Sequence, residues 1–431
     1  MDNRVAIIGA GYAGLVAAVE LAAAGRRVEL FEASRTLGGR ARRIDAEGTV
    51  LDNGAHILVG AYRETLRLMR TVGIDSDRVL RRHPLHLEYP GEMRIAAPSW
   101  LPAPLHMAWA LLAARGLPLT DKLAAVRFMR AMEAQRFRLP EDTTASALFA
   151  AHGQGERLRR YLWEPLCVAA LNTEAERGSA QVFLNVLRDS LAADRAASDL
   201  LLPATDFSEL LPEPAAAWLA ANGSTVHRSC RIEGLQRTDA GWMLASADET
   251  HGPYANVILA VAPYHLGKLI DGLPLAALVE TLQAFEWEPI VTAYLAYPPE
   301  VRLPFAMVGV AGGHAQWLFD RGALCGQPGL IAAVISAHGR HEELDHDELC
   351  SRIAAETERA VGRPLPPPHW QRVIVEKRAT FACTPGLRRP ACATGLPGLH
   401  LAGDYVAGEY PATIEGAVRS GATAARAVLE R

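Results

Sequence analysis

Val5–Gly14, with the sequence V-A-I-I-G-A-G-Y-A-G, is the stretch that decides the fold of this chain. Its first four residues are apolar and mostly β-branched, which is typical of a strand buried on both faces of a parallel sheet. Gly9, Gly11 and Gly14 then follow in the spacing G-x-G-x-x-G. In this spacing the first glycine allows a tight turn, the second lets the backbone approach a pyrophosphate, and the third lets a helix pack on the strand. The stretch therefore predicts a strand, a turn and a helix that bind a dinucleotide.

The residues that follow complete this unit. Apolar residues recur at helical spacing from Ala13 onward, and Gly25 is placed to end the helix. A second strand is expected at Val28 to Phe31. Glu32 lies at its end, 18 residues after Gly14, where an acidic side chain accepts hydrogen bonds from a ribose diol. The N-terminus of the helix, with Ala13, is expected to meet the phosphates.

The next segment distinguishes between NAD and FAD, which share the features described so far. Leu37-Gly38-Gly39-Arg40 resembles the extension found in the amine-oxidase and phytoene-desaturase superfamily of flavoproteins, and this resemblance implies FAD as the cofactor. It also implies that the backbone at Gly39 passes close to the cofactor and that Arg40 lies near the phosphates. Arg42 and Arg43 are alternatives for this cationic role.

A further segment, Leu51-Asp52-Asn53-Gly54-Ala55-His56, resembles the part of the family that passes beside the flavin ring. The resemblance places Gly54 at the cofactor and His56 near the isoalloxazine. A purely structural histidine is the alternative reading of His56, and the sequence does not decide between the two.

The C-terminal segment predicts the other half of the cofactor site. Leu399 to Asp404 has the pattern of a buried strand that ends in Gly403 and an acid, and Asp404 is suited to hold a ribityl hydroxyl. A helix is expected after Tyr410 and Pro411, with Thr413 and Ile414 at its start. Its N-terminus would favour negative charge on a reduced flavin, because a helix start carries about half a positive charge.

Both ends of the chain are therefore assigned to one nucleotide domain, with a substrate domain inserted between them. Strands are expected at Thr225–Leu235, Gly241–Ala247 and Val257–Val261, and Ile232 in the first is placed at the cofactor. Residues 80–215 are rich in helix formers and carry few strand signals, whereas strands dominate from Pro289 to Ile335. The predicted fold is α/β: a Rossmann-like FAD-binding domain with an inserted α+β substrate domain, like amine oxidases and phytoene desaturases. The expected boundaries are residues 1–75, 215–275 and 375–431 for the FAD-binding domain, and 76–214 and 276–374 for the substrate domain.

Composition excludes several classes of function. The net charge of -4 gives no electrostatic footprint for nucleic acid, so we expect no nucleic-acid partner. The six cysteines form no C-x-x-C pair, so we expect no metal site and a reduced, cytoplasmic setting. Residues Met1 to Arg4 show no signal-peptide pattern, and the apolar window Pro98 to Leu119 is too interrupted to span a bilayer. No second G-x-G-x-x-G follows a strand, so electrons must pass through the substrate, oxygen or an external donor.

The middle of the chain carries a narrower resemblance. Trp163–Thr173, Ser179–Leu184, Arg188–Leu191 and Ser198–Pro203 resemble the hydroxysqualene dehydroxylase family, also known as squalene-associated FAD-dependent desaturases of hopanoid biosynthesis. The similarity continues through Gln316–Gly322, Glu376–Gly386 and Ala402–Tyr405, so it covers nearly the whole chain. What the resemblance implies is reduction of hydroxysqualene to squalene, with reduced FAD as the hydride donor and water as the leaving product.

Such a reaction needs a proton donor, an apolar tunnel and electron-rich faces beside an allylic cation. Glu164 is our first candidate for the general acid, because its apolar neighbours in the sequence can desolvate its carboxyl group. Asp320 and Tyr410 are the runners-up, and a structural carboxylate is the alternative reading of Glu164. The candidate aromatic rings are Tyr161, Trp163, Trp317, Phe319, Tyr405 and Tyr410.

An isoprenoid substrate partitions into lipid, so the sequence also predicts peripheral contact with a membrane, at its inner face. An apolar entrance is expected at Trp100, Leu101, Leu105, Met107, Trp109, Leu111 and Leu112, with Arg115 at the level of the headgroups. A buried helix that lines the tunnel is the alternative reading. Rival functions are a carotenoid-type desaturase, an amine-type flavin oxidase, and a lipid-handling protein without catalysis.

Overall fold

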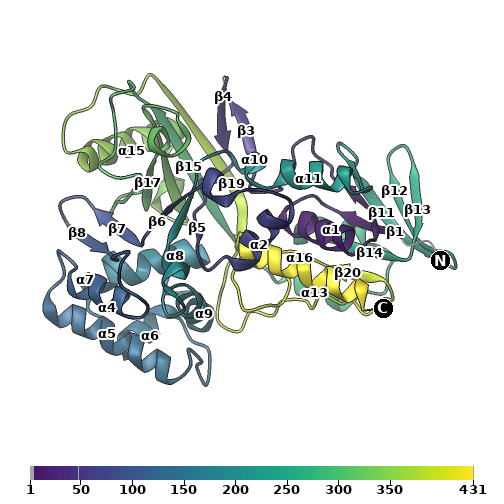
Figure 1. The fold of residues 1–431 in the computed structure, drawn as a ribbon, viewed down its shortest axis with the longest axis horizontal. Coiled ribbons are helices and arrows are strands. Elements are labelled where there is room, and N and C mark those ends of the chain that lie inside the picture. Colours follow the sequence, from purple (N-terminus) through teal and green to yellow (C-terminus); the bar gives the residue numbers. More distant parts are fainter. Residues whose placement is uncertain (1–3, 47, 431) are drawn as a thin grey trace.

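A computed structural model describes residues 4–46 and 48–430 of the chain. The expectation about a signal peptide falls largely on residues 1–3, which lie outside the described residues. Figure 1 shows a parallel sheet with its helices at the end of the molecule that carries both chain termini. A second sheet and a group of helices lie at the opposite end.

The first sheet has five strands that are all parallel to their neighbours, in the order β10-β2-β1-β14-β20. The strands are β1 (Arg4–Ile8), β2 (Arg27–Phe31), β10 (Thr225–His227), β14 (Asn256–Leu259) and β20 (Leu399–Leu401). Ile8 pairs with Phe31 on one side and with Leu259 on the other. The sheet therefore takes strands from the beginning, the middle and the end of the chain, and the strands at Val5–Ile8, Val28–Phe31 and Leu399–Leu401 lie where the sequence predicts them.

Helices lie beside this sheet. Three of them, α1 (Tyr12–Ala23), α11 (Pro212–Ala221) and α16 (Ile414–Leu429), contact its strands. α2 (Arg63–Thr71) packs on α16, α3 (Ser76–Val79) follows α2, and α10 (Phe207–Leu210) packs on α11. α16 packs directly on α1, as the side-by-side ribbons in Figure 1 show. A Cβ atom on Gly421 of α16 would lie 2.2 Å from the carbonyl oxygen of Ala13 in α1, so this contact requires glycine.

Smaller elements extend the same part of the molecule. An antiparallel sheet consists of β11 (Ile232–Thr238), β12 (Gly241–Ser246) and β13 (Thr250–Tyr254), and a hairpin consists of β3 (Arg43–Ala46) and β4 (Thr49–Asp52). Two helices, α12 (Pro263–Leu269) and α13 (Ala276–Gln283), lead away from β14. The sequence-predicted strand Thr225–Leu235 is therefore divided between two sheets.

The second large sheet is antiparallel, in the order β16-β17-β18-β15-β19. Its strands are β15 (Trp287–Ala296), β16 (Met307–Gly309), β17 (Trp317–Asp320), β18 (Leu330–Ser336) and β19 (Trp370–Phe381). α14 (Arg321–Cys325) and α15 (His346–Val361) accompany it, together with a 3₁₀ turn at Arg340–Glu343. One face packs on α15, where Val291 and Leu295 of β15 and Ile353 of α15 belong to a single core cluster.

Residues 80–215 are mainly helical, as predicted. The helices are α4 (Leu105–Leu112), α5 (Leu119–Ala134), α6 (Ala145–Ala151), α7 (Glu156–Leu158), α8 (Glu164–Leu171) and α9 (Ala180–Ser190), with a π-helical turn at Arg159–Trp163 and a 3₁₀ turn at Arg195–Ser198. Four short strands also lie in this region, where the sequence carries few strand signals. It holds the hairpin β7 (His86–Tyr89) and β8 (Met93–Ala96), and it holds β6 (Leu80–His83) and β9 (Leu200–Pro203), which pair with each other and, through β9, with β5 (Leu58–Val59).

The reason is the distance between partners. β6 has the sequence LRRH with three exposed residues, and it becomes a strand by pairing with the buried LLLP of β9, which comes more than a hundred residues later. Neither segment alternates in the way that identifies a strand from local sequence.

Among the described residues, no helix is long and apolar enough to cross a membrane. The domain boundaries given above remain a prediction.

Candidate active site

One large cavity, of about 970 Å³, connects the first sheet with the second. Thirteen of the fourteen residues that the sequence places at the cofactor line this cavity. They are Gly9, Gly11, Ala13, Glu32, Gly39, Arg40, Gly54, His56, Ile232, Gly403, Asp404, Thr413 and Ile414. The fourteenth, Gly14, lies beneath the wall. Segments from both ends of the chain thus meet around a single space.

The three glycines of the opening motif have different surroundings. Gly9 adopts φ +102°, and a Cβ atom there would lie 2.6 Å from the carbonyl oxygen of Ala260 on the neighbouring chain segment. A Cβ atom on Gly14 would lie 1.9 Å from the carbonyl oxygen of Gly9, so the helix rests directly on the turn. A Cβ atom on Gly11 would have only the Cα atom of Gly39 within 4 Å, at 3.9 Å. The cavity side of Gly11 is therefore open, as required for backbone that approaches a phosphate.

Glu32 holds the turn that follows β1. Its two carboxylate oxygens accept hydrogen bonds from the backbone N–H groups of Ala10 and Ser34, each at 2.8 Å. These bonds fix the carboxylate at the edge of the cavity, at the carboxyl end of β2. Each oxygen retains a lone pair for a further donor, which suits a ribose diol.

Arg40 and Asp404 bring the two ends of the chain together. The Arg40 guanidinium donates to Asp404 Oδ2 at 2.7 Å and to the carbonyl oxygen of Ala379 at 2.6 Å. Asn53 also lines the cavity and donates from Nδ2 to Glu376 Oε2 at 3.1 Å. Of the alternative cations, Arg42 also lines the cavity. Arg43 pairs with the exposed Asp45 at 3.3 Å.

His56 and the start of α16 face the middle of the cavity. His56 Nδ1 lies 2.7 Å from the carbonyl oxygen of Gly54, and burial lowers the pKa of the imidazole, so the ring is neutral near pH 7 with its proton on Nδ1. The Thr413 hydroxyl accepts from the N–H of Gly416 and caps α16. The capped helix therefore begins at the cavity wall, with its positive end toward the space.

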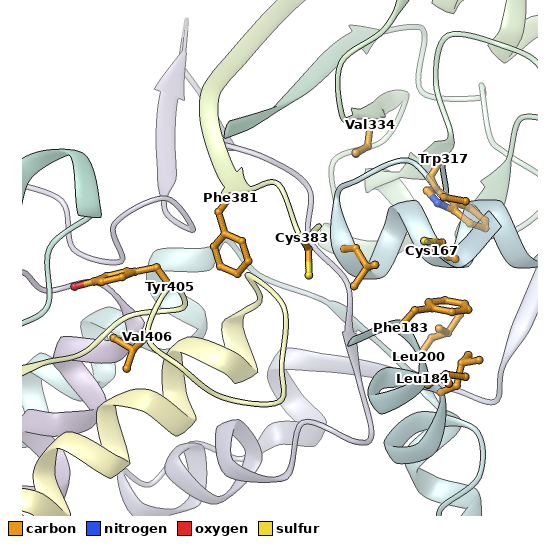
Figure 2. Close-up of a cluster of buried hydrophobic side chains, with 14 of the residues drawn as sticks. Cys167, Phe183, Leu184, Leu200, Trp317, Val334, Phe381, Cys383, Tyr405 and Val406 are labelled. Atoms are coloured by element: carbon orange, nitrogen blue, oxygen red, sulfur yellow. The ribbon is translucent and has the colours of Figure 1, made fainter. Parts of the chain in front are cut away.

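The part of the cavity that faces the second sheet and the helices is apolar. Its walls come from β7, α8, α9 and the inner face of β16, β17 and β18. The lining residues there include Leu87, Leu166, Phe183, Leu187, Leu200, Ile290, Met307, Trp317, Phe319 and Val334. Figure 2 shows Phe183, Leu200, Trp317 and Val334 on one side of this cluster and Tyr405 on the other, nearer the first sheet.

Four of the six predicted aromatic residues line the cavity: Trp317, Phe319, Tyr405 and Tyr410. The other two have structural roles away from it. The Trp163 indole N–H donates to Gln154 Oε1 at 2.8 Å in the buried core, and the Tyr161 hydroxyl bonds to Glu92. The prediction that Trp163 and Tyr161 face a substrate is therefore not supported by their positions.

The three candidate acids occupy quite different places. Glu164 does not line the cavity; it is half-buried, 3.9 Å from Arg159, and burial followed by the charge of Glu176 raises the pKa of its carboxyl group. Asp320 is buried as the N-cap of α14, where it accepts from Ala323 and Leu303 backbone N–H groups. Neither position allows contact with a molecule in the cavity, so the structure argues against both as general acids.

Tyr410 is the candidate acid that does line the cavity. Its hydroxyl donates to Asp189 Oδ2 at 2.7 Å and accepts from the Arg419 guanidinium at 3.2 Å. Burial and the bond to Asp189 raise the pKa of Tyr410, so the phenol is protonated at neutral pH. The Arg419 guanidinium also lies over the ring, 4.1 Å from its centroid.

Sequence reasoning did not identify two polar features of the wall. Asn172 Nδ2 donates to Thr380 Oγ1 at 2.9 Å, which leaves the Thr380 hydroxyl proton available to an acceptor in the cavity. An asparagine at the end of an apolar helical run, which is typical of a left-handed C-cap such as Asn172 adopts, is the sequence signal that could have drawn attention to it. The Tyr405 hydroxyl is buried and has no hydrogen-bond partner among the described residues, although it lines the cavity.

Comparison with known proteins defines the class of this molecule. The family model described as "Flavin containing amine oxidoreductase" matches residues 12–429. The chain therefore belongs to the flavin-containing amine oxidoreductase family, it is an oxidoreductase, and its cofactor is a flavin.

Within this family the chain is similar to proteins named hydroxysqualene dehydroxylase. It is 34% identical to that of Rhodopseudomonas palustris, with 100% of this chain and 99% of the relative covered. It is 32% identical to that of Sinorhizobium fredii, with the same coverage. A probable zeta-carotene desaturase of Synechococcus elongatus is more distant, at 25% identity over 99% of this chain and 98% of the relative.

Solved structures confirm the predicted fold class. An oxidoreductase from Methanosarcina mazei superposes with a TM-score of 0.75 at 15% identity, covering 99% of this chain and 100% of the other. Putrescine oxidase bound to putrescine superposes with a TM-score of 0.72 at 18% identity, covering 99% of each chain. These likenesses concern the fold alone.

Proposed function

We propose that this protein binds FAD and reduces hydroxysqualene to squalene, a reaction of hopanoid precursor biosynthesis. The observation that carries the proposal is the single cavity, which joins a dinucleotide cradle at one end to an apolar chamber at the other. The relatives named hydroxysqualene dehydroxylase, which match over the full length of the chain, support the same reaction.

The residues around the cradle fit FAD. Gly11 leaves room for a pyrophosphate, Glu32 is fixed where a ribose would lie, and the start of α16 faces the middle of the cavity. The Tyr405 hydroxyl, which has no hydrogen-bond partner in the described part of the chain, can bond to a polar group of the cofactor. We assign the adenosine side to Gly9, Gly11, Ala13 and Glu32, and the flavin side to His56, Asp404, Thr413 and Ile414. Reduced FAD supplies a hydride and its two electrons when bound.

The apolar chamber fits a long hydrocarbon. Its lining of aliphatic and aromatic side chains removes such a chain from water, and each CH₂ group buried contributes about 0.8 kcal/mol. The rings of Trp317 and Phe319 line the chamber and can stabilise a delocalised cation through their π faces. The chamber also keeps water away from the cation. Without this protection, water would add to the cation and form the alcohol again.

We assign the proton donor to Tyr410. Protonation of the allylic hydroxyl breaks the C–O bond and releases water, and the hydride forms the new C–H bond. Tyr410 lines the cavity and is protonated at neutral pH, and the substrate oxygen would replace Asp189 as the acceptor of its proton. The Arg419 guanidinium would then offset the charge of the phenolate. Asp189 is not the source, because hydrogen bonds from Arg188 and Tyr410 outweigh burial and hold the pKa of that carboxyl below its usual range.

Anaerobic single-turnover mixing tests the proposal. The protein with reduced FAD is mixed with hydroxysqualene, and we expect reoxidation of the flavin with formation of an equal amount of squalene. A flavin that stays reduced would refute the reaction. Flavin reduction by an isoprenoid or by an amine, in the converse experiment with oxidised FAD, would favour a desaturase or an amine oxidase. In turnover, an external electron donor must supply the two electrons.

The same assay tests the acid. Tyr410→Phe removes the proton and keeps the ring, and we expect the rate of flavin reoxidation to fall by about 10²–10⁴-fold, the usual contribution of a general acid. Glu164→Gln is the matched control and should leave the rate unchanged. Equal rates for Tyr410→Phe and the unmodified protein would exclude Tyr410.

A further inference from the structure

Large hydrophobic side chains that are exposed gather in one part of the surface. Of the seven among the described residues, six lie between positions 100 and 123. They are Trp100, Leu105, Trp109, Leu112, Leu119 and Leu123, and their exposed fractions range from 44% to 72%. We refer to these six residues as the apolar patch. Single exposed apolar residues are ordinary, but a concentration of this kind marks an interaction surface.

Five residues of the apolar patch lie on two helices that contact each other, α4 and α5, and Trp100 lies in the turn before α4. Leu105, Trp109 and Leu112 are spaced four and three residues apart, so they share the outer face of α4. The rings of Trp100 and Trp109 lie 6.4 Å apart. Figure 1 shows α4 and α5 at the lower left, at the end of the molecule remote from both termini.

The helices that carry most of the apolar patch have an excess of basic residues. Residues 105–134, which span α4 and α5, contain four basic residues, Arg115, Lys122, Arg127 and Arg130, and two acidic residues, Asp121 and Glu133, although the whole chain has a net charge of -4. On α5, Leu119 and Leu123 begin an outer stripe that continues with Arg127 and Arg130, both of which are exposed. An apolar stripe that turns into a cationic one matches the profile of a lipid surface, with acyl chains below anionic headgroups.

The inner face of α4 reaches the wall of the cavity. His106 is fully buried, and its Nε2 atom lies 3.1 Å from the hydroxyl of Ser198. Ser198 lines the cavity. One short helix therefore carries the apolar patch on its outer side and contacts the cavity wall on its inner side.

We propose that the apolar patch docks on a bilayer that contains anionic lipid, and that α4 lies between this bilayer and the cavity. Tryptophan side chains enter the interfacial layer, where their amphipathic rings are favoured, and Arg127 and Arg130 meet the phosphates. A second copy of the chain fits less well, because a two-fold contact would bring the same basic residues together. The docking itself does not depend on the proposed function, but its purpose, uptake of a lipid-soluble substrate, rests on it.

Vesicle flotation with the flavin-loaded protein tests the docking. We expect the protein to float with vesicles of phosphatidylcholine and phosphatidylglycerol, and to bind less to phosphatidylcholine alone. Trp109→Glu with Leu112→Glu should weaken binding by about tenfold or more, and Arg127→Glu with Arg130→Glu should weaken it on anionic vesicles. Val375→Glu is the matched control, because Val375 is the remaining exposed hydrophobic residue of the described chain, at 41% exposure. Arg363→Glu, at another exposed arginine, is the control for charge reversal.

The outcomes separate the docking from the chemistry. Equal flotation of the patch variants and the controls would overturn the proposal, as would a protein that does not float at all. Dimers that become monomers in the Trp109→Glu, Leu112→Glu variant, without flotation, would identify a second copy as the occupant and also overturn it. The flavin spectrum and the thermal midpoint show whether each variant is folded. If a patch variant does not fold, the double variant Leu119→Gln, Leu123→Gln is used in its place.

Turnover completes the test. We expect the patch variants to keep activity on detergent-solubilised hydroxysqualene and to lose it on substrate embedded in vesicles. Flotation without turnover in either format refutes the proposed function and leaves the docking intact. Full activity of the patch variants on embedded substrate would show that the apolar patch is not the route by which substrate arrives.

Discussion

Gly11 and Gly14 lie three residues apart in one motif and face different neighbours. The space beside Gly11 is open in the protein, whereas the space beside Gly14 is occupied by the carbonyl oxygen of Gly9, 1.9 Å from where a Cβ atom would be. The first glycine therefore serves a bound molecule, and the second serves the packing of α1 on the turn. A substitution at each position should separate cofactor binding from folding.

We predict that Gly11→Ala leaves the thermal midpoint of the flavin-free protein nearly unchanged but lowers its affinity for FAD by about tenfold or more, which corresponds to about 1.4 kcal/mol. Gly14→Ala should destabilise the flavin-free protein by about 1–3 kcal/mol, the usual effect of overpacking. Thermal unfolding without flavin and fluorescence titration with FAD measure the two effects. A loss of stability in Gly11→Ala equal to that in Gly14→Ala would contradict the assignment.

His106 makes stability depend on pH in a defined direction. Burial, followed by the charge of Arg195, lowers the pKa of this imidazole below its ordinary value of 6.5, although nearby Asp199 acts in the opposite direction. Just below pH 6.5, His106 therefore binds a proton in the unfolded chain but stays neutral in the folded protein. Stability is fully present above pH 6.5 and is lost as pH falls toward the folded pKa.

His106→Gln removes this titration and keeps a polar group beside Ser198. We expect the denaturation midpoint of the unmodified protein to fall more steeply than that of the variant between pH 6.5 and pH 5. One unit of pKa shift corresponds to about 1.4 kcal/mol. Parallel pH profiles for the two proteins would show that His106 does not titrate in this way.

At the scale of elements, α16 begins at the cavity through one side chain. Thr413 Oγ1 accepts from the N–H of Gly416 at 3.1 Å, and this bond fixes the first turn whose free N–H groups face the cavity. Removing an N-cap of this kind costs about 1 kcal/mol. The same loss would loosen the part of the wall assigned to the flavin.

We therefore predict that Thr413→Ala lowers the stability of the protein by about 1 kcal/mol and weakens FAD binding, whereas Thr413→Ser preserves both. The flavin reduction potential should become more negative in Thr413→Ala, because a frayed helix start stabilises the reduced anion less. Spectroelectrochemical titration measures the potential. An unchanged potential would mean that the α16 start does not act on the flavin electrostatically.

Buried apolar elements were easier to predict than exposed edge strands. β1, β2 and β20 are fully or largely buried and apolar, and α16 has a clear helical period, so local sequence identifies them. β6 is an edge strand of four residues with three exposed, and its conformation depends on pairing with β9. No local pattern records a partner so far along the chain, which is why the strands within residues 80–215 were missed.

At the scale of the whole molecule, the N- and C-terminal helices are held together by glycine. A Cβ atom on Gly421 would lie 2.2 Å from the carbonyl oxygen of Ala13, which is in the first turn of α1 and lines the cavity. Any side chain there would push α16 away from α1. The start of α1 is assigned to the adenosine side of the cofactor site and the start of α16 to the flavin side. A shift of α16 away from α1 would therefore change the geometry of both sides.

We predict that Gly421→Ala destabilises the protein by about 1–3 kcal/mol and weakens FAD binding. The matched control is Gly267→Ala in α12, where a Cβ atom would meet nothing within 4 Å, and this change should be neutral or stabilising by up to about 1 kcal/mol. Thermal midpoints and FAD titration of the two variants provide the comparison. Equal behaviour of the two would show that the α1–α16 contact tolerates a methyl group.

The residues that line the cavity could be predicted in part from the sequence, for a physical reason. Gly9, Gly11 and Glu32, which are predicted to bind the cofactor and line the cavity, could be named because a phosphate and a ribose impose fixed spacings on one continuous segment. A proton donor obeys no such spacing, because its position depends on which helix face meets the cavity. Glu164 has apolar neighbours in the sequence, yet α8 turns it away from the cavity and toward Arg159.

The sequence by itself determined the parallel sheet at the N-terminus and its dinucleotide-binding turn, since both depend on a local pattern of glycines, apolar runs and a terminal acid. The flavin and the inserted arrangement followed from the resemblance of several segments to known flavoproteins. Only the tertiary structure decided which side chains share the cavity, because Arg40 with Asp404 and Asn172 with Thr380 are pairs of residues more than 200 positions apart. Only it decided, too, that Leu119 and Leu123 join Trp109 and Leu112 on one exposed surface. The spacing of residues along one segment can be taken directly from the sequence, whereas contacts between distant segments form only when their apolar faces are buried together.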